Sequence, residues 1–213
     1  MEKITEQQLV LWVNQTGEGS EQALAQLYTH LARRIHGFAF QYLSDTHQAE
    51  EVVTETMFEV WKNAKVFAGG SKVTTWVLGI ARHKALDKLR GRDRIGRVEQ
   101  EWDDTAEEIV SEETGALRLL EQEEMAETVA ECIAQLPEDQ RKCIHMVFFQ
   151  ELSISEVAEI ECIPKNTVKT RLFHARRKLR SALERRLGND GYDLGTQTMG
   201  HSTEVDLNSQ HSI

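Results

Sequence analysis

Residues 164–186 restrict the fold of this chain more than any other segment. Apolar side chains recur there on one helical face, and nine basic residues with one acid, Glu184, stand among the other positions. Pro164 suits the first helical turn, which does not need its missing N–H. Residues 155–160 predict a short helix that begins with a serine, and residues 161–163 predict a tight turn. This order indicates a DNA-binding helix-turn-helix, with a solvated basic helix as the alternative.

The remaining segments also predict helices, so we expect an all-α fold of two small helical domains. Strand-like alternation is absent, and the only prolines, Pro137 and Pro164, stand where helices are expected to begin. No stretch reaches the roughly 18 apolar residues of a membrane span, and the N-terminus does not resemble a signal peptide. The expected helices are residues 5–15, 20–43, 46–64, 73–90, 119–136 and 137–148.

Charge is segregated along this acidic chain, whose net charge is −10. Residues 82–97 hold seven basic and two acidic residues, whereas residues 99–127 hold twelve acidic and one basic residue. We expect residues 99–127 to be unstructured and to separate two cationic surfaces. Because the acidic segment repels phosphates, the chain alone is expected to bind random DNA weakly.

The expected helix at 46–64 has one apolar and one acidic face. Like charges four residues apart repel, so this face is either a docking surface for a basic partner or a solubility device. The acidic face carries Glu50, Glu51, Glu55 and Glu59 beside Thr54. Further along, the glycine-containing loop at 67–72 precedes a basic helix that opens near Trp76. Loop and helix suit single-stranded nucleic acid, although a tryptophan there is more often a core residue.

The three cysteines, Cys132, Cys143 and Cys162, have apolar neighbours and lack metal-ligand spacing, even with His145. We therefore expect buried free thiols in a reducing cytoplasm, and neither a metal nor a cofactor. Paired carboxylates, an activated nucleophile and a phosphate loop in context are also lacking, so an enzyme is not expected.

Four blocks of the sequence resemble family motifs. Residues 48–58 (QAEEVVTETMF) are similar to region 2.2 of bacterial sigma factors, and residues 67–90 to regions 2.3 and 2.4. Residues 136–141 (LPEDQR) are similar to the opening of region 4, and residues 156–176 to its helix-turn-helix. The blocks follow in the family's order and spacing, so the chain resembles the extracytoplasmic-function (ECF) group of the sigma-70 family.

The resemblance implies a division of the chain. Residues 1–92 would form a region 2 domain that binds core polymerase and the −10 element. Residues 93–118 would be an acidic flexible linker that threads a cationic channel of the polymerase. Residues 119–187 would form a region 4 domain that binds the −35 element, and residues 188–213 a disordered tail.

The implied function is promoter-specific transcription initiation with RNA polymerase in the cytoplasm. An anti-sigma factor would control this activity, and a base of the −10 strand would be flipped out of the duplex. The clamp coiled coil of the large polymerase subunit would meet Glu50, Glu51, Thr54 and Glu55. The −10 strand would meet Phe67, Gly70, Ser71, Lys72, Thr75, Trp76, Arg82, His83, Lys84, Asp87, Lys88 and Arg90. The −35 duplex would meet Lys165, Asn166, Thr167, Lys169, Thr170, Arg171, Phe173, His174, Arg176 and Arg177.

Three positions depart from the family pattern. Cys162 replaces the turn glycine, Asn166 replaces a glycine of the recognition helix, and His83 replaces an asparagine. The promoter sequence that family members read therefore does not carry over in detail to this chain. A stand-alone helix-turn-helix regulator is the alternative function, but it would not need the acidic helix and the basic Trp-led helix of residues 48–90.

Overall fold

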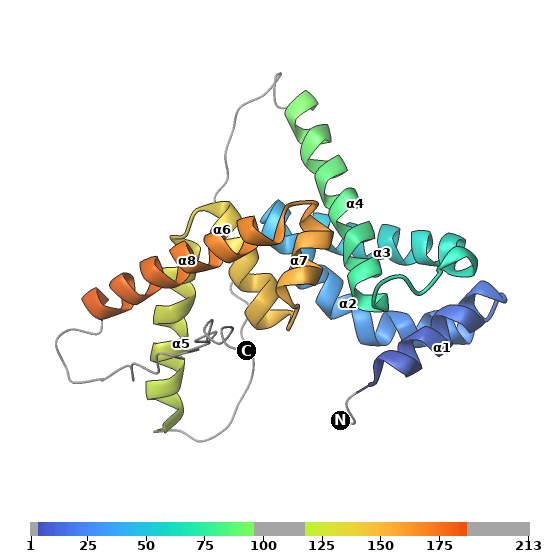
Figure 1. The fold of residues 1–213 in the computed structure, drawn as a ribbon, viewed down its shortest axis with the longest axis horizontal. Coiled ribbons are helices and arrows are strands. Elements are labelled where there is room, and N and C mark those ends of the chain that lie inside the picture. The colour runs from blue at the N-terminus through green and yellow to red at the C-terminus, as the bar shows by residue number, and fades with distance from the viewer. Residues whose placement is uncertain (1–3, 96–117, 187–213) are drawn as a thin grey trace, which may run out of the picture.

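The computed structural model describes residues 4–95 and 118–186, and every regular element in these ranges is helical (Figure 1), which confirms the all-α prediction for them. The first half holds α1 (Glu6–Gly17), α2 (Glu21–Leu43), α3 (Thr46–Asn63), the 3₁₀ turn η1 (Ala64–Val66) and α4 (Val73–Ile95). The second half holds α5 (Arg118–Ala134), α6 (Glu138–Ile144), the π-helical turn η2 (His145–Phe149), α7 (Ile154–Glu161) and α8 (Lys165–Arg186).

Side-chain caps fix where most helices of the first half begin. Thr5, Ser20 and Asp45 accept hydrogen bonds from backbone N–H groups three residues ahead, at 3.3, 3.2 and 2.9 Å. These caps satisfy donors that have no partner inside the helix. They also agree with the helix starts that the sequence predicts.

The first half packs α2, α3 and α4 around a shared core, with α1 beside α2 (Figure 1). Leu27, Ile35, Val52, Val60 and Val77 are fully buried there. Their 3.6-residue spacing gives each helix one apolar face, and these faces meet in the core. The core holds the acidic face of α3 and the basic face of α4 outward in fixed register.

The helix-turn-helix consists of α7 and α8, whose contact buries Val157, Ile160, Val168 and Leu172. Helix α7 begins at Ser153, which forms a reciprocal capping box with Glu156. The serine expected at the helix start, Ser155, is therefore not the cap, because only Ser153 stands three residues before a glutamate.

The expectation of three buried cysteines is wrong for Cys162. Cys132 and Cys143 are buried, whereas Cys162 is exposed in the turn between α7 and α8. Its φ of 55° places it in the left-handed region, the conformation that ends α7. This turn directs the side chain outward, away from its apolar sequence neighbours.

The two halves of the described structure pack against each other. Helix α7 lies against α4, while α6 and η2 contact α2 (Figure 1). Buried residues from both halves form one continuous hydrophobic cluster. The helix-turn-helix is therefore held against the loop and helix predicted to bind the −10 strand.

Several helix ends differ from expectation. Helix α4 runs to Ile95, beyond the expected end near residue 90, and α5 runs from Arg118 to Ala134, so its first residues belong to the acidic segment expected to be unstructured. The helix expected at residues 137–148 ends as α6 at Ile144 and continues as the π-helical turn η2. The rest of the predicted linker and the predicted tail lie outside the described residues. Among the described helices, none is both long and apolar enough to cross a membrane.

Candidate polymerase and nucleic-acid interfaces

The side chains predicted to bind polymerase lie together on the exposed face of α3. They are Glu50, Glu51, Thr54 and Glu55. Lys88 of α4 reaches the same face, with its amine 2.6 Å from Glu51 Oε2 and 2.9 Å from Glu55 Oε1. The hydrogen bond from Lys88 lowers the pKa of the Glu51 carboxyl, so this carboxylate is ionised at neutral pH. Lys88, which the sequence assigns to the −10 surface, is thus engaged by the acidic face of α3.

The loop and helix predicted to bind the −10 strand form a second surface. The rings of Phe67 and Trp76 lie 4.8 Å apart and are tilted by 36°, which fixes the loop on the start of α4. Of the twelve predicted residues, Gly70, Lys72, His83, Asp87 and Arg90 are exposed. Those partly buried are Phe67, Ser71, Trp76, Arg82, Lys84 and Lys88, and Thr75 is buried.

Acidic residues from other elements contact this −10 surface. Glu156 of α7 lies 3.0 Å from the Lys72 amine and accepts a hydrogen bond of 3.2 Å from the Thr75 hydroxyl. Glu161, at the end of α7, lies 3.6 Å from Arg82 Nε. Burial alone would raise the pKa of Glu156, but hydrogen bonds from Ser153 and the contact with Lys72 lower it to about 2. The Glu156 carboxylate therefore faces Lys72 as a charged group.

The predicted −35 surface has a different environment. Val168, Leu172 and Ala175 bury one face of α8. Of the ten predicted residues, those exposed on the opposite side are Lys165, Asn166, Lys169, Thr170, Phe173, His174, Arg176 and Arg177, while Thr167 and Arg171 are partly buried. The exposed set has the charge and reach that a helix in the major groove requires.

Two predicted −35 residues contact neighbouring elements. The guanidinium of Arg171 is 2.5 Å from Asp139 of α6, and its side chain is 25% exposed. Arg176 lies over the ring of Phe148, 5.5 Å from its centroid. Arg171 therefore ties α8 to α6, whereas Lys169, Thr170 and Phe173 project from the exposed side.

Sequence reasoning missed the residues that join the two halves. Tyr42 of α2 donates a hydrogen bond to Glu161, and Lys142 of α6 lies 3.9 Å from the centroid of the Tyr42 ring. Arg34 of α2 donates to the side chain and the backbone of Gln150. These partners are more than 75 residues apart in sequence, so no local pattern could reveal them.

We searched the described residues for metal sites. Among them, no three His, Cys, Asp or Glu side chains lie together in a way that could hold a metal ion. The interfaces consist instead of carboxylates on α3 and cations on α4 and α8. This chemistry suits a macromolecular partner better than a small ligand.

Comparison with known proteins identifies the family. The sigma-70 region 2 model matches residues 27–95, and the sigma-70 region 4 model matches residues 126–179. The ECF RNA polymerase sigma factor SigK of Mycobacterium tuberculosis is 32% identical over 168 residues, covering 76% of this chain and 86% of SigK. The chain belongs to the ECF group of the sigma-70 family. The ECF sigma factor RpoE of Cereibacter sphaeroides is 33% identical over 162 residues, covering 75% of this chain and 86% of RpoE.

Solved sigma-factor structures share the fold of this ECF protein. RpoE of Bartonella quintana, in complex with the anti-sigma factor NepR, aligns with a TM-score of 0.60 at 22% identity and covers 75% of this chain and 95% of RpoE. CnrH, in complex with the cytosolic domain of CnrY, aligns with a TM-score of 0.57 at 20% identity and covers 84% of this chain and 99% of CnrH. The helical architecture predicted for an ECF sigma factor is thereby confirmed.

Proposed function

We propose that this ECF sigma factor directs promoter-specific initiation through three surfaces of its own. The clamp face, formed by Glu50, Glu51, Thr54 and Glu55, binds the coiled coil of the large polymerase subunit. The exposed carboxylates suit a basic partner, and opposite charge gives such an interface both specificity and a fast on-rate. The division into a region 2 and a region 4 domain, at residues 1–92 and 119–187, belongs to the same proposal.

The other two surfaces receive the promoter. The −10 surface on loop 67–72 and α4 combines paired aromatic rings with cations and takes the separated strand. The exposed side of α8 enters the major groove at the −35 element, with Lys169, Thr170 and Phe173 toward the base edges. Arg177 contacts phosphates and sets position more than sequence.

The observation that carries this proposal is the presence of both sigma-70 regions, in order, with an exposed acidic helix in one and an exposed basic helix in the other. A stand-alone regulator needs only the helix-turn-helix, and it does not explain the acidic face of α3. We further propose that the protein acts in the cytoplasm without enzymatic activity and under an anti-sigma factor, as RpoE of Bartonella quintana is bound by NepR.

Run-off transcription tests the proposed function. Core polymerase is incubated with genomic DNA fragments in the presence and absence of the full chain. Defined transcripts that require both proteins are expected. Specific shifts of duplex DNA by the chain alone, with no polymerase-dependent transcripts, would indicate the regulator instead.

A further inference from the structure

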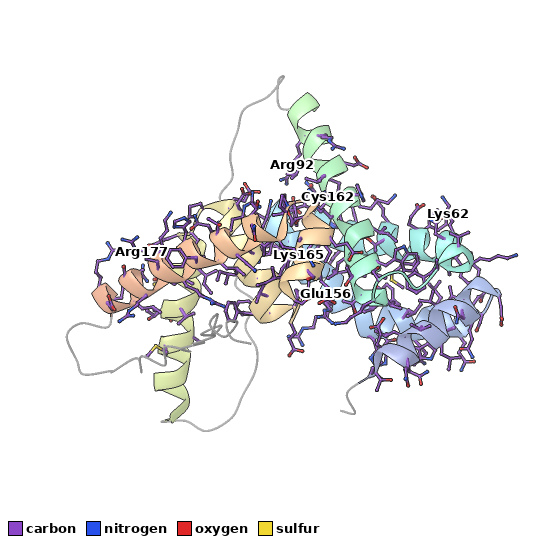
Figure 2. All side chains as sticks on the ribbon, viewed as in Figure 1. Lys62, Arg92, Glu156, Cys162, Lys165 and Arg177 are labelled. Carbon is purple, nitrogen blue, oxygen red and sulfur yellow. The ribbon has the colours of Figure 1, made fainter. Side chains whose placement is uncertain are left out.

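A cavity between α5 and α8 lies apart from the contact between the two halves. Its volume is about 360 Å³, which falls within the range of about 300–1,000 Å³ that small-molecule sites usually have. Three cations of α8 line it, Arg177, Lys178 and Arg185, and Arg177 stands on the part of α8 that packs on α5 (Figure 2). The cavity therefore has the size of a ligand site and a cationic wall.

The charge of this wall differs from that of the whole chain. The net charge of the chain is −10, yet no described Asp or Glu lines the cavity. Its three cations form no ion pair with any residue in the described part of the chain, whereas Arg180 and Arg186 of the same helix are paired with Glu184 and Glu131. Because a hollow lined by one sign of charge concentrates the electrostatic field, this cavity attracts anions.

The other walls supply apolar surface and hydrogen-bonding groups. Cys132 and Leu136 are buried on the α5 side, with 1% and 5% of their surface exposed. The Ser181 hydroxyl and the Gln135 amide add neutral polar groups. Nε of Arg185 donates a hydrogen bond of 3.0 Å to the Ser181 carbonyl, which holds the guanidinium in place and leaves its terminal nitrogens for a ligand. Guanidinium groups bind phosphoryl oxygens through paired hydrogen bonds.

The α8 residues of the cavity form one stripe of the helix. They are His174, Arg177, Lys178, Ser181, Ala182 and Arg185, at i, i+3, i+4, i+7, i+8 and i+11. The proposed −35 surface accounts for His174 and Arg177, but it accounts for neither Lys178 nor Arg185. Because the cations are spread over about two turns, a ligand with several anionic groups fits better than a single small anion.

We propose that the cavity between α5 and α8 binds a small ligand with adjacent phosphoryl groups, such as inorganic pyrophosphate or a nucleoside diphosphate. Arg177, Lys178 and Arg185 hold the phosphoryl groups, and the apolar side at Cys132 and Leu136 can receive a nucleobase. The bound ligand also withholds Arg177 from duplex DNA. This last step rests on the proposed function, whereas ligand binding itself does not.

Isothermal titration calorimetry of the full chain tests the binding, with inorganic pyrophosphate and adenosine diphosphate as separate probes. Ionic strength is kept constant, and sulfate serves as the single small anion. Saturable binding of one ligand per chain is expected for at least one of the two probes, with much weaker binding of sulfate. Tighter binding of adenosine diphosphate than of pyrophosphate would assign a nucleotide to the site, and equal affinities would assign the phosphoryl groups alone.

Two double variants separate the cavity from the general charge of α8. Lys178→Gln with Arg185→Gln removes two cations of the cavity and should weaken binding about tenfold or more. Lys169→Gln with Arg180→Gln makes the same charge change on the same helix outside the cavity and should bind like wild type. A third protein, Ser181→Trp, fills the cavity from an exposed position without changing any charge and should not bind the ligand.

Fluorescence anisotropy with a −35 duplex from the run-off assay tests the competition. The probe that binds should weaken duplex binding by the wild-type chain more than sulfate does at equal ionic strength, and this extra loss should vanish in Ser181→Trp. An equal loss with sulfate would overturn the competition, since ionic strength alone would explain it.

Three results would overturn the site itself. They are the absence of saturable binding of both probes, equal weakening in the two double variants, and unchanged affinity in Ser181→Trp. Failure of the proposed function looks different, because the chain would then give no polymerase-dependent transcripts while the ligand still bound to the cavity.

Discussion

The basic residues of α4 and those of α8 carry the same charge but lie in different surroundings. Cations of α4 and its preceding loop meet acids of the same chain in the pairs Lys72–Glu156, Arg82–Glu161, Lys84–Glu59, Lys88–Glu51, Arg90–Asp87 and Arg92–Asp45. On α8, Lys165, Lys169 and Arg177 form no ion pair with any residue in the described part of the chain.

This difference bears on how one acidic protein could use the two DNA-binding surfaces that we propose. Lys165, Lys169 and Arg177 can meet phosphates without losing an internal ion pair, so we expect their contribution to binding to depend mainly on released counterions, whereas Arg171 would first have to leave Asp139. At the −10 surface, DNA must replace carboxylates that already hold the cations. We therefore expect region 4 to bind duplex DNA readily and region 2 to bind a strand only after rearrangement.

The largest expected effect concerns the acidic side of these pairs. Glu51 and Glu55 of α3 either bind polymerase or serve only to neutralise Lys88 of α4. We expect Glu51→Lys with Glu55→Lys to lose core binding, because each desolvated pair lost costs ~2 kcal/mol or more. Pull-down of core polymerase measures this loss, with circular dichroism to verify the helices.

Lys88→Gln is the matched control for that experiment. It removes the internal partner but leaves both carboxylates exposed, so core binding should be retained. If the double lysine variant binds core polymerase as well as wild type does, the clamp face is only a solvated face paired with α4.

The next effect separates residues within α8. Lys169→Ala should cost ~1–3 kcal/mol of affinity for a −35 duplex, since its side chain projects from the exposed side. Arg171→Ala should cost less, because Asp139 already binds the guanidinium. Holoenzyme binding to promoters with single −35 base changes provides the measurement.

Arg180→Ala, further along the helix, should weaken all promoters alike and reduce the salt dependence. Should Arg171→Ala instead cause the larger loss together with altered base preference, Arg171 leaves Asp139 in the complex and reads a base directly. Arg171 would then resemble the paired cations of α4 and not the unpaired cations of α8.

The smallest expected effect is a pH dependence at the contact between the halves. His145 of η2 lies beside Gly37 of α2, and burial lowers its pKa from 6.5 to about 4. A depressed pKa means that the unfolded chain binds the proton first, so the stability contribution is full above pH 6.5 and is lost as pH falls toward 4. Melting temperature should therefore drop over this window in wild type and drop less in His145→Gln. If the melting temperature falls equally with pH in both proteins, protonation of His145 does not cause the loss of stability.

Much of the scaffold was predictable because its signals are local. Apolar periodicity located the helices, and the predicted starts agree with the observed caps Thr5, Ser20 and Asp45. The exposed acids of α3 and bases of α8 follow from the same periodicity, which leaves them opposite the core. The family motifs in turn indicated the ECF group, which the relatives with 32% and 33% identity confirm.

The interface between the halves was not predictable in the same way. Tyr42, Glu156 and Glu161 come together only when distant segments pack, and nothing in their neighbourhoods signals a partner. Cys162 was placed wrongly because apolar neighbours outweighed the turn that it occupies. The Ser153 cap had a readable signal, since a serine three residues before Glu156 is a capping box.

We expect the free chain to be closed, with α7 against α4, and to open when polymerase binds. Pulsed electron paramagnetic resonance tests it with spin labels at Glu18→Cys and Ser181→Cys, two exposed positions in opposite halves. The exposed thiol is removed by Cys162→Asn, because asparagine tolerates the left-handed turn.

We expect one narrow distance distribution for the free chain, replaced by longer distances on binding core polymerase. The same distribution in the free and the polymerase-bound chain would show that the two halves do not separate on binding.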